Sequence, residues 1–365
     1  MKTILRPSYF ETGERSFVEH QELKATLRKT DNDICIVTIS SPQISLEILP
    51  FQGQQIWKAT IGGRNITMKS EVDEPVCTTD YLRNYGAFLV HCGATAMGGP
   101  SPEDAHPLHG ELPNAIYNSA WIETGDNENG EHYIEIHGNY KHQVAMTVNY
   151  VAHPVIRITQ GDSLVHVSMN IENKSKAAMD FMYLAHLNFV PVLGSKIEAT
   201  HLWDTDSVQV RSSFPAHIQV PEETKTLLKA LAENPELSSN INPDPAYDPE
   251  AVMSIKYLAD EKGFAHTLQV HPDGTSDYVR HFPASAPNAI RCIQLTDHHS
   301  CVGIAMPATA GVEGYKTEKA NGNVISIPAS SSYEIAFDFA SLDIEETNVI
   351  RGKIGEVLSK SSSST

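Results

Sequence analysis

Apolar side chains occupy every second position in several short stretches of the chain. The pattern runs over residues 165–171 and again over 333–339, and shorter versions cover 133–137 and 143–148. Successive side chains of a β-strand point to opposite faces of its sheet, so a period of two places the apolar groups of a stretch on one face. Each stretch is therefore predicted to be a strand with one face against a core.

Clusters rich in Gly, Asn and Asp separate these stretches. They cover residues 61–65, 125–130, 160–162 and 272–275, and each has the composition of a tight turn. Many short strands at near-regular spacing, with little helix between them, are typical of an antiparallel sandwich or barrel. The fold class is therefore predicted to be all-β and antiparallel.

One segment departs from this pattern and predicts a helix. Residues 221–231 begin with a proline, carry two glutamates in the first turn and continue with helix-forming residues. The stretch that follows, 234–249, is rich in Pro, Asn, Asp and Ser and is expected to be a loop. We therefore expect a short helical insertion, a helix and loop over 221–250.

The chain is expected to form one domain, because large β-sandwiches often exceed about 200 residues as a single unit. That domain covers residues 1–365. Residues 1–30 are expected to be an N-terminal extension, and the serine-rich residues 360–365 a flexible tail.

The formal net charge of −18 limits the classes of partner. An acidic chain without a cluster of Lys and Arg repels nucleic acids and anionic membranes. No apolar stretch approaches the ~20 residues that a membrane-spanning helix needs, and Arg6 and Pro7 interrupt the N-terminus before an apolar signal segment forms. The sequence favours a cytoplasmic protein that binds a small neutral molecule, or an anion held by a local arginine, and neither nucleic acid nor membrane.

The five cysteines include no closely spaced pair. An odd number without a Cys-x-x-Cys motif indicates reduced thiols rather than a disulfide or zinc framework.

Two histidines are the main candidates for chemistry. His109 lies in a Leu-His-Gly sequence at 108–110, and His186 lies in a strand-like stretch at 181–189. Imidazole has an unperturbed pKa near neutrality, so two imidazoles at one site could exchange protons with a neutral substrate. A single histidine on a strand is more often a hydrogen-bonded structural residue, so their type alone does not assign a role.

The Leu-His-Gly sequence and the later His-x-Asn-Phe sequence at 186–189, in this order and spacing, resemble the motifs of the aldose 1-epimerase (galactose mutarotase-like) superfamily, in a divergent branch of it. The similarity runs from about residue 44 to residue 339. It implies a β-supersandwich with a sugar cleft on one curved sheet, an isomerase that needs no cofactor and no metal, and a monosaccharide or sugar derivative as substrate. It also allows a homodimer.

In that family the reaction is acid/base opening and closure of the sugar ring. The resemblance implies that His186 is the general acid at the ring oxygen and that His109 binds a sugar hydroxyl and helps orient the ring. Asn188, two residues after His186, is expected on the same strand face, where it would orient the imidazole or bind a hydroxyl.

The base of the family is a glutamate on a late strand, and here Met306 occupies the matching position. Methionine accepts no proton at neutral pH. Either another carboxylate serves, or the alignment is shifted, or the chain performs no ordinary mutarotation. The candidates for the base are Glu313 and Glu318, with Glu111 as a more distant alternative.

Several other residues are candidates for substrate binding. Arginine can donate two parallel hydrogen bonds to hydroxyls or to a carboxylate, and both candidate arginines are expected near turns. The set of substrate-binding candidates is Arg64, Arg83, Asn188, Glu111 and His91.

Two alternative functions stay open from the sequence. The first is a different sugar isomerase or epimerase on the same scaffold, with a metal among His91, His106 and His109, although their spacing lacks the His-x-His and the downstream Glu and His of the cupin metal motif. The second is a non-catalytic sugar-binding protein that has kept the cleft and lost the base, for which Met306 is the main support.

Overall fold

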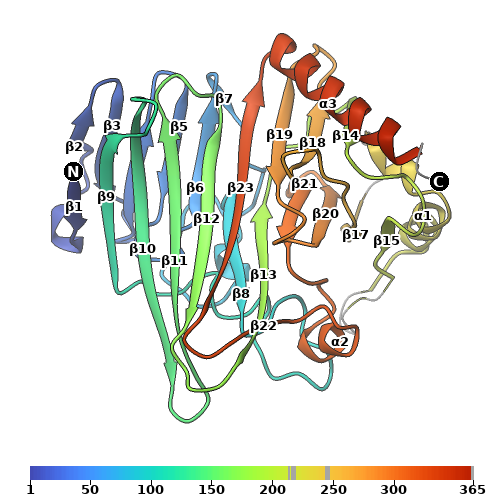
Figure 1. Ribbon diagram of the computed structural model, residues 1–365, viewed down its shortest axis with the longest axis horizontal. Coiled ribbons are helices and arrows are strands. Elements are labelled where there is room, and N and C mark those ends of the chain that lie inside the picture. Colours follow the sequence, from blue (N-terminus) through green and yellow to red (C-terminus); the bar gives the residue numbers. More distant parts are fainter. Residues whose placement is uncertain (213, 215–218, 243–246, 363–365) are drawn as a thin grey trace.

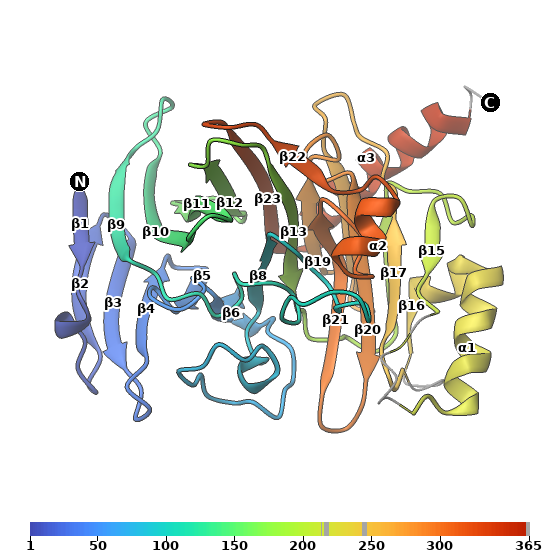
Figure 2. The same cartoon turned by 90° about the horizontal axis from the view of Figure 1, so that it is seen from below.

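A computed structural model describes residues 1–212, 214, 219–242 and 247–362 and arranges them in two large antiparallel β-sheets (Figure 1). The predicted all-β class is confirmed. The two ends of the described chain lie at opposite ends of the long axis (Figures 1 and 2).

The first sheet has ten strands. In order across the sheet they are β1 (Lys2–Leu5), β9 (Ser119–Asp126), β10 (His132–Val144), β11 (Val148–Thr159), β12 (Val165–Asn173), β23 (Ser332–Leu342), β19 (Ser276–His281), β18 (Ala265–Val270), β14 (Ser195–Ala199) and β16 (Asn240–Ile241).

The second sheet has thirteen strands. Eleven follow one another in the order β15 (Val208–Val210), β17 (Ala251–Ile255), β20 (Asn288–Leu295), β21 (Ser300–Ala308), β13 (Met179–Leu187), β8 (Leu89–Ala94), β6 (Ile56–Ile61), β5 (Ile44–Ile48), β4 (Cys35–Ser40), β3 (Leu23–Lys29) and β2 (Arg15–His20). The other two, β22 (Ile325–Ile327) and β7 (Arg64–Asn65), pair with β13 and β6.

The two clearest alternating stretches of the sequence lie side by side as β12 and β23. Val167 lies opposite Phe337 and Met169 opposite Ile335, and all four side chains are buried. Because these residues all point into the space between the sheets, the period of two in the sequence becomes a continuous apolar layer. The four turns predicted from Gly, Asn and Asp connect β6 to β7, β9 to β10, β11 to β12 and β18 to β19.

One predicted strand is wrong. The alternation over 143–148 continues through a hairpin turn that joins β10 to β11, and the Thr147 N–H donates to the Val144 carbonyl at 3.2 Å across this turn. Met146 has a φ of +66° and is fully exposed. The apolar residues at the tip mimicked a strand because periodicity alone does not detect a change of chain direction.

The structure has three α-helices among its described residues: α1 (Glu222–Glu233), α2 (Tyr315–Ala320) and α3 (Ile344–Ser362). The first lies where the sequence predicts a helix, in the insertion 221–250, of which residues 243–246 lie outside the described part. Helix α1 buries Leu228 and Leu231 against the core.

The long helix α3 was not expected. It begins with a capping box, in which the Glu346 N–H donates to the Asp343 carboxylate at 2.9 Å and the Asp343 N–H donates to the Glu346 carboxylate at 3.1 Å. Ile350 and Ile354 of this helix pack on the outer face of the ten-stranded sheet, in a second apolar cluster that includes Tyr278. The Asp-x-x-Glu sequence ahead of apolar residues was the signal that could have predicted it.

Both ends of the chain are part of this architecture. Residues 1–30 contribute β1 to an edge of the ten-stranded sheet and β2 and β3 to an edge of the thirteen-stranded sheet. The segment expected as a tail is helical as far as Ser362, and residues 363–365 lie outside the described part.

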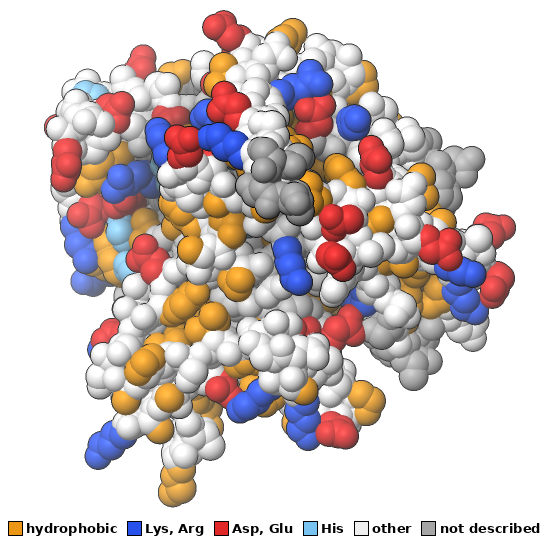
Figure 3. All heavy atoms as spheres, turned by 45° about the vertical axis from the view of Figure 1, so that its right-hand side comes forward, with side chains coloured by type: hydrophobic (Ala, Val, Ile, Leu, Met, Phe, Trp, Pro, Cys, Tyr) orange, Lys and Arg blue, Asp and Glu red, His pale blue; other side chains and the backbone are white. Residues whose placement is uncertain are grey.

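In the described part of the chain, no helix combines the length and the apolar character that crossing a membrane requires. On the face drawn in Figure 3, acidic and basic side chains are interspersed.

Candidate functional site

His186 lies near the end of β13, which runs through the middle of the thirteen-stranded sheet. Its Nδ1 lies 2.8 Å from the side-chain oxygen of Asn188, and the Asn188 amide nitrogen donates to the Ala87 carbonyl at 2.9 Å. Since that nitrogen is the donor of the amide, the oxygen is an acceptor and the His186 Nδ1 carries the hydrogen. Asn188 therefore holds the imidazole in one tautomer and leaves Nε2 for a ligand.

His109 is held by a turn that needs its glycine neighbour. His109 has a φ of +60° and Gly110 a φ of +76°, both in the left-handed region. A Cβ at Gly110 would lie 2.2 Å from the Ala96 carbonyl oxygen, so a side chain there would clash. The backbone of His109 is fixed on both sides, because its N–H donates to the Gly98 carbonyl at 3.0 Å and its carbonyl accepts from the Gly93 N–H at 2.9 Å.

The two histidines meet in space. Their ring centroids are 5.5 Å apart and their planes are nearly perpendicular at 88°. Tyr81 lies 4.7 Å from the His109 ring, and Tyr85 lies 5.5 Å from the His186 ring, both measured between centroids. The structure thus brings together two motifs that lie 77 residues apart in the sequence, and surrounds them with two tyrosines.

Burial determines the protonation states of the two histidines and the two tyrosines. It lowers the pKa of His186 to about 4, against the opposing effect of the hydrogen bond to Asn188. Burial also lowers the pKa of His109, and the nearby charges of His186 and Arg211 lower it further. Burial raises the pKa of Tyr81 and of Tyr85 well above the usual range. At pH 7 both imidazoles are therefore neutral and both phenols keep their protons.

An ion pair that no sequence motif indicated is near enough to influence the pKa values of His109 and Tyr81. Arg211 follows β15, Glu250 precedes β17, and their charged groups are 3.6 Å apart. The Nε of Arg211 is buried without a hydrogen-bond partner. After burial and neighbouring thiols, the Glu250 carboxylate contributes to the raised pKa of Tyr81. No motif marks either residue in the sequence, because each is a single charge at the end of a short strand.

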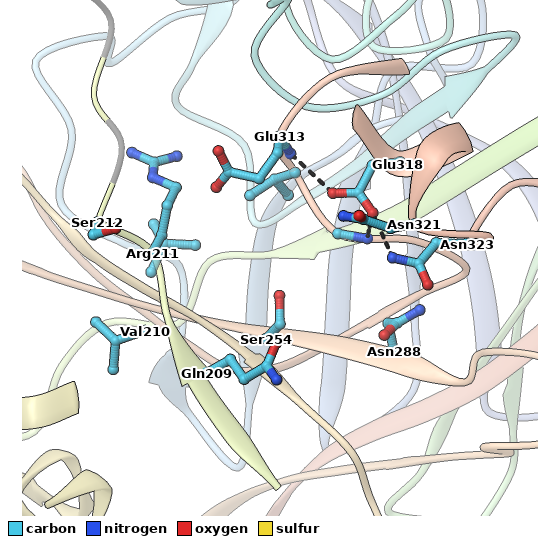
Figure 4. Close-up of a pocket in the computed structure, with 13 residues that line it drawn as sticks. Gln209, Val210, Arg211, Ser212, Ser254, Asn288, Glu313, Glu318, Asn321 and Asn323 are labelled. Atoms are coloured by element: carbon cyan, nitrogen blue, oxygen red, sulfur yellow. Dashed lines mark hydrogen bonds between the residues drawn. The ribbon is translucent and has the colours of Figure 1, made fainter. Parts of the chain in front are cut away.

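Arg211 also lines a cavity of about 310 Å³ that contains Glu313. Figure 4 shows the Glu313 carboxylate directed toward Arg211, whereas the Glu318 carboxylate is directed toward Asn321 and Asn323. Pockets that hold small ligands start at about 300 Å³, so the cavity is large enough for one monosaccharide. Most of its other lining groups are amides and hydroxyls, which suit a neutral polyol.

A loop that lines the cavity adjoins the turn that carries His109. The Gly98 carbonyl accepts the His109 N–H at 3.0 Å, and the Gly99 N–H donates to the Val312 carbonyl at 3.0 Å. A Cβ at Gly98 would lie 2.3 Å from the Val312 oxygen, so the two loops are in direct contact. Backbone hydrogen bonds through Gly98 and Gly99 therefore link the loop that carries Glu313 to the turn that carries His109.

Glu318, the second carboxylate suggested by the sequence, is buried and fully engaged with the loop that carries Glu313. It accepts hydrogen bonds from the Gly311 N–H at 3.0 Å, the Glu313 N–H at 3.2 Å and the Asn323 side chain at 2.7 Å. These contacts use both carboxylate oxygens. Glu318 therefore shapes the cavity, and its geometry favours Glu313 over Glu318 as a group that reaches a ligand.

This arrangement predicts the effect of a Glu318→Gln substitution. An amide supplies only one oxygen to three donors, so we expect one buried N–H to lose its acceptor, at about 1–3 kcal/mol of unfolding free energy. Urea denaturation measures the change. Glu128→Gln, in an exposed turn, is the matched control and should leave the midpoint unchanged; equal midpoints for the two variants would contradict the anchoring role.

The structure does not bring Arg64 to the histidines. Its guanidinium pairs with the buried Asp277 and donates to the Ser341 hydroxyl at 3.0 Å, so it joins β7 to the ten-stranded sheet.

Arg83 and Glu111 lie close to the two histidines, but Arg83 is exposed whereas Glu111 is engaged in hydrogen bonds. Arg83 lies in the short 3₁₀ turn between Tyr81 and Tyr85 and is exposed. The Glu111 carboxylate accepts from the Thr95 N–H at 3.1 Å, from its hydroxyl at 3.0 Å and from the Tyr150 hydroxyl at 2.9 Å. These contacts tie the Leu-His-Gly turn to its neighbours.

His91 lies on the other face of the sheet. It is paired with Ala185 on β13, one residue before His186, so the two histidines point to opposite sides. Its Nδ1 lies 2.6 Å from the Tyr183 hydroxyl, and burial lowers its pKa to about 3. Among the described residues, neither of the two side-chain groups close enough to share a metal ion contains His91, His106 or His109.

Comparisons with known proteins place the chain in a family. A model described as a domain of unknown function, DUF4432, matches residues 32–340. No curated protein matches the sequence at a significant level.

Solved structures with a similar fold share little sequence with this chain. A "putative aldose 1-epimerase" from Klebsiella pneumoniae has a TM-score of 0.80 at 17% identity, over 98% of this chain and 95% of the other. Galactose 1-epimerase from Lactobacillus acidophilus has a TM-score of 0.54 at 10% identity, over 90% of this chain and 98% of the other. The Slr1438 protein from Synechocystis has a TM-score of 0.55 at 13% identity, over 82% and 92%.

At these identities the likeness concerns the fold alone, and it is the galactose mutarotase-like β-sandwich that the two sequence motifs implied. The family model covers well over half of the residues. The chain therefore belongs to the DUF4432 family, with the fold of the aldose 1-epimerases.

Proposed function

We propose that this protein is a sugar isomerase that interconverts the anomers of a neutral monosaccharide by acid/base opening and closure of the ring. The observation that carries the proposal is the convergence of His109 and His186, with ring centroids 5.5 Å apart, beside a cavity that holds Glu313 and Arg211. The similar fold of galactose 1-epimerase supports it at the level of architecture.

Ring opening requires two proton transfers at neighbouring oxygens. In the proposed reaction the Glu313 carboxylate takes the proton of the anomeric hydroxyl while the imidazolium form of His186, a small fraction at pH 7, delivers a proton from Nε2 to the ring oxygen. The C1–O5 bond breaks, the aldehyde rotates, and closure from the other face returns both protons. His109 and Arg211 hold sugar hydroxyls, since binding must orient the ring before either transfer.

The pH dependence of the rate tests the role of His186. Its pKa of about 4 is below that of a free imidazole, so the protonated form falls tenfold for each pH unit above about 4. If His186 is the general acid, kcat/KM should decrease as pH rises from 5 to 7. Saturation-transfer NMR or polarimetry on a panel of hexoses and pentoses measures the exchange.

A rate that stays constant above pH 5 would assign His186 the opposite role, because a neutral imidazole with a free Nε2 is a proton acceptor. Sugar binding without exchange above the solvent background would overturn the enzymatic proposal in favour of a sugar-binding protein. One observation favours that second function: Met306 is 1% exposed on β21 and offers no carboxylate where the family has its base.

A further inference from the structure

A cluster of two histidines and one aspartate lies at the opposite end of the sandwich from the candidate site. The His132 Nδ1 lies 2.6 Å and the His20 Nε2 lies 3.3 Å from the same oxygen of Asp126. The two imidazole centroids are 5.2 Å apart, with their planes at 86°. All three ligand atoms lie within 4.8 Å of one another.

The strands fix all three backbones. Asp126 and His132 are directly paired across β9 and β10, at the turn that joins them. His20 is the last residue of β2, and Gln21, with a φ of +56°, begins the next turn. The cluster therefore joins the edge of the thirteen-stranded sheet to the ten-stranded sheet.

We propose that His20, Asp126 and His132 bind a divalent transition-metal ion of the Zn²⁺ class. Two imidazole nitrogens and one carboxylate oxygen are a ligand set that Zn²⁺, Co²⁺ and Ni²⁺ share, whereas Mg²⁺ and Ca²⁺ prefer oxygen alone. The three side chains are between 27% and 55% exposed, so water can complete the coordination.

The distances suit such an ion after a small adjustment. Bonds of about 2.1 Å at tetrahedral angles place two ligand atoms about 3.4 Å apart. The His20–Asp126 distance of 3.3 Å already meets this value, and the His132–Asp126 distance of 2.6 Å must lengthen by less than 1 Å. Both side chains are partly exposed and have room to move.

Charge also favours this cluster over a second one nearby. The second group, Glu123, Glu135 and His137, already holds a cation, because Arg157 donates to the Glu135 carboxylate at 2.6 Å. A metal ion would have to displace that guanidinium.

Isothermal titration of the full chain, without an affinity tag, with Zn²⁺ tests the proposal. We expect one equivalent to bind with micromolar affinity, and Co²⁺ to give a visible d–d spectrum from the same site. His20→Ala, His132→Ala and Asp126→Asn should each weaken binding at least tenfold. His142→Ala is the matched control, since this half-buried histidine lies on the same strand β10 ten residues away.

Thermal unfolding supplies an independent readout. An ion that joins the two sheets binds only the folded chain, so at about 100 times the dissociation constant it should raise Tm by about 3 °C. The control variant should keep this shift and the three cluster variants should lose it. Absence of stoichiometric binding to the wild type, or unchanged binding in the cluster variants, would overturn the proposal.

Discussion

Replacement of His186 by alanine is expected to lower kcat/KM for anomer exchange by about 10²–10⁴-fold, the usual contribution of a positioned acid or base. The imidazole is the only part of this residue that can transfer a proton, and Asn188 holds it in one tautomer at 2.8 Å. Saturation-transfer NMR measures the exchange, with circular dichroism to verify that the variant folds.

Two further variants sharpen this result. Glu313→Gln should lose activity to a comparable extent and keep sugar affinity, because the amide preserves shape and hydrogen bonding but cannot take the proton. His142→Ala, which removes a half-buried histidine of the other sheet, should leave the rate unchanged. Full activity in His186→Ala would remove the proposed acid from the mechanism.

Asp277→Asn is expected to destabilise the fold by about 3–5 kcal/mol, the cost of breaking a buried ion pair from one side. Asp277 is completely buried and pairs with Arg64, and it also accepts from Gln269 at 2.8 Å and lies 3.1 Å from the His271 Nε2. The substitution leaves the Arg64 guanidinium without a counter-charge between the two sheets. Urea denaturation gives the change in unfolding free energy.

Asp273→Ala, in the exposed turn of the same hairpin, is the control and should cost less than about 1 kcal/mol. The comparison also separates two roles of Arg64. If Arg64 joins the sheets, its replacement by methionine lowers stability and leaves sugar affinity unchanged. Loss of sugar affinity with unchanged stability would instead support the substrate-binding role expected from the sequence.

Much of the fold could be predicted because it depends on local patterns. The alternation over 165–171 and 333–339 needs only the geometry of a strand, and the structure pairs these two stretches directly. The same reasoning failed over 143–148, where apolar residues continue around a hairpin tip. The alternating pattern also gave no sign of α3. The apolar side chains of this helix pack on the outer face of the ten-stranded sheet, and the sequence does not show where that face lies.

The candidate site could be predicted only in part. The Leu-His-Gly motif can be recognised in the sequence because the turn at Gly110 leaves no space for a side chain and so requires glycine. The spacing of His186 and Asn188 places both on one strand face. Glu318 and Glu313 looked equivalent in sequence. Both line the cavity, but three hydrogen bonds engage the Glu318 carboxylate with its own loop, whereas the Glu313 carboxylate is directed toward Arg211 (Figure 4).

The sequence by itself determined the class of fold, the positions of a few strands and the two histidine motifs, because each of these follows from backbone geometry within a few residues. Only the tertiary structure decided which charges surround those histidines. Arg211 and Glu250 come together because β15 and β17 pair at the edge of the sheet, and the loop of Glu313 adjoins the turn of His109 because both contact Gly98. Such contacts depend on how distant segments pack, and side-chain patterns along the chain carry no record of that packing.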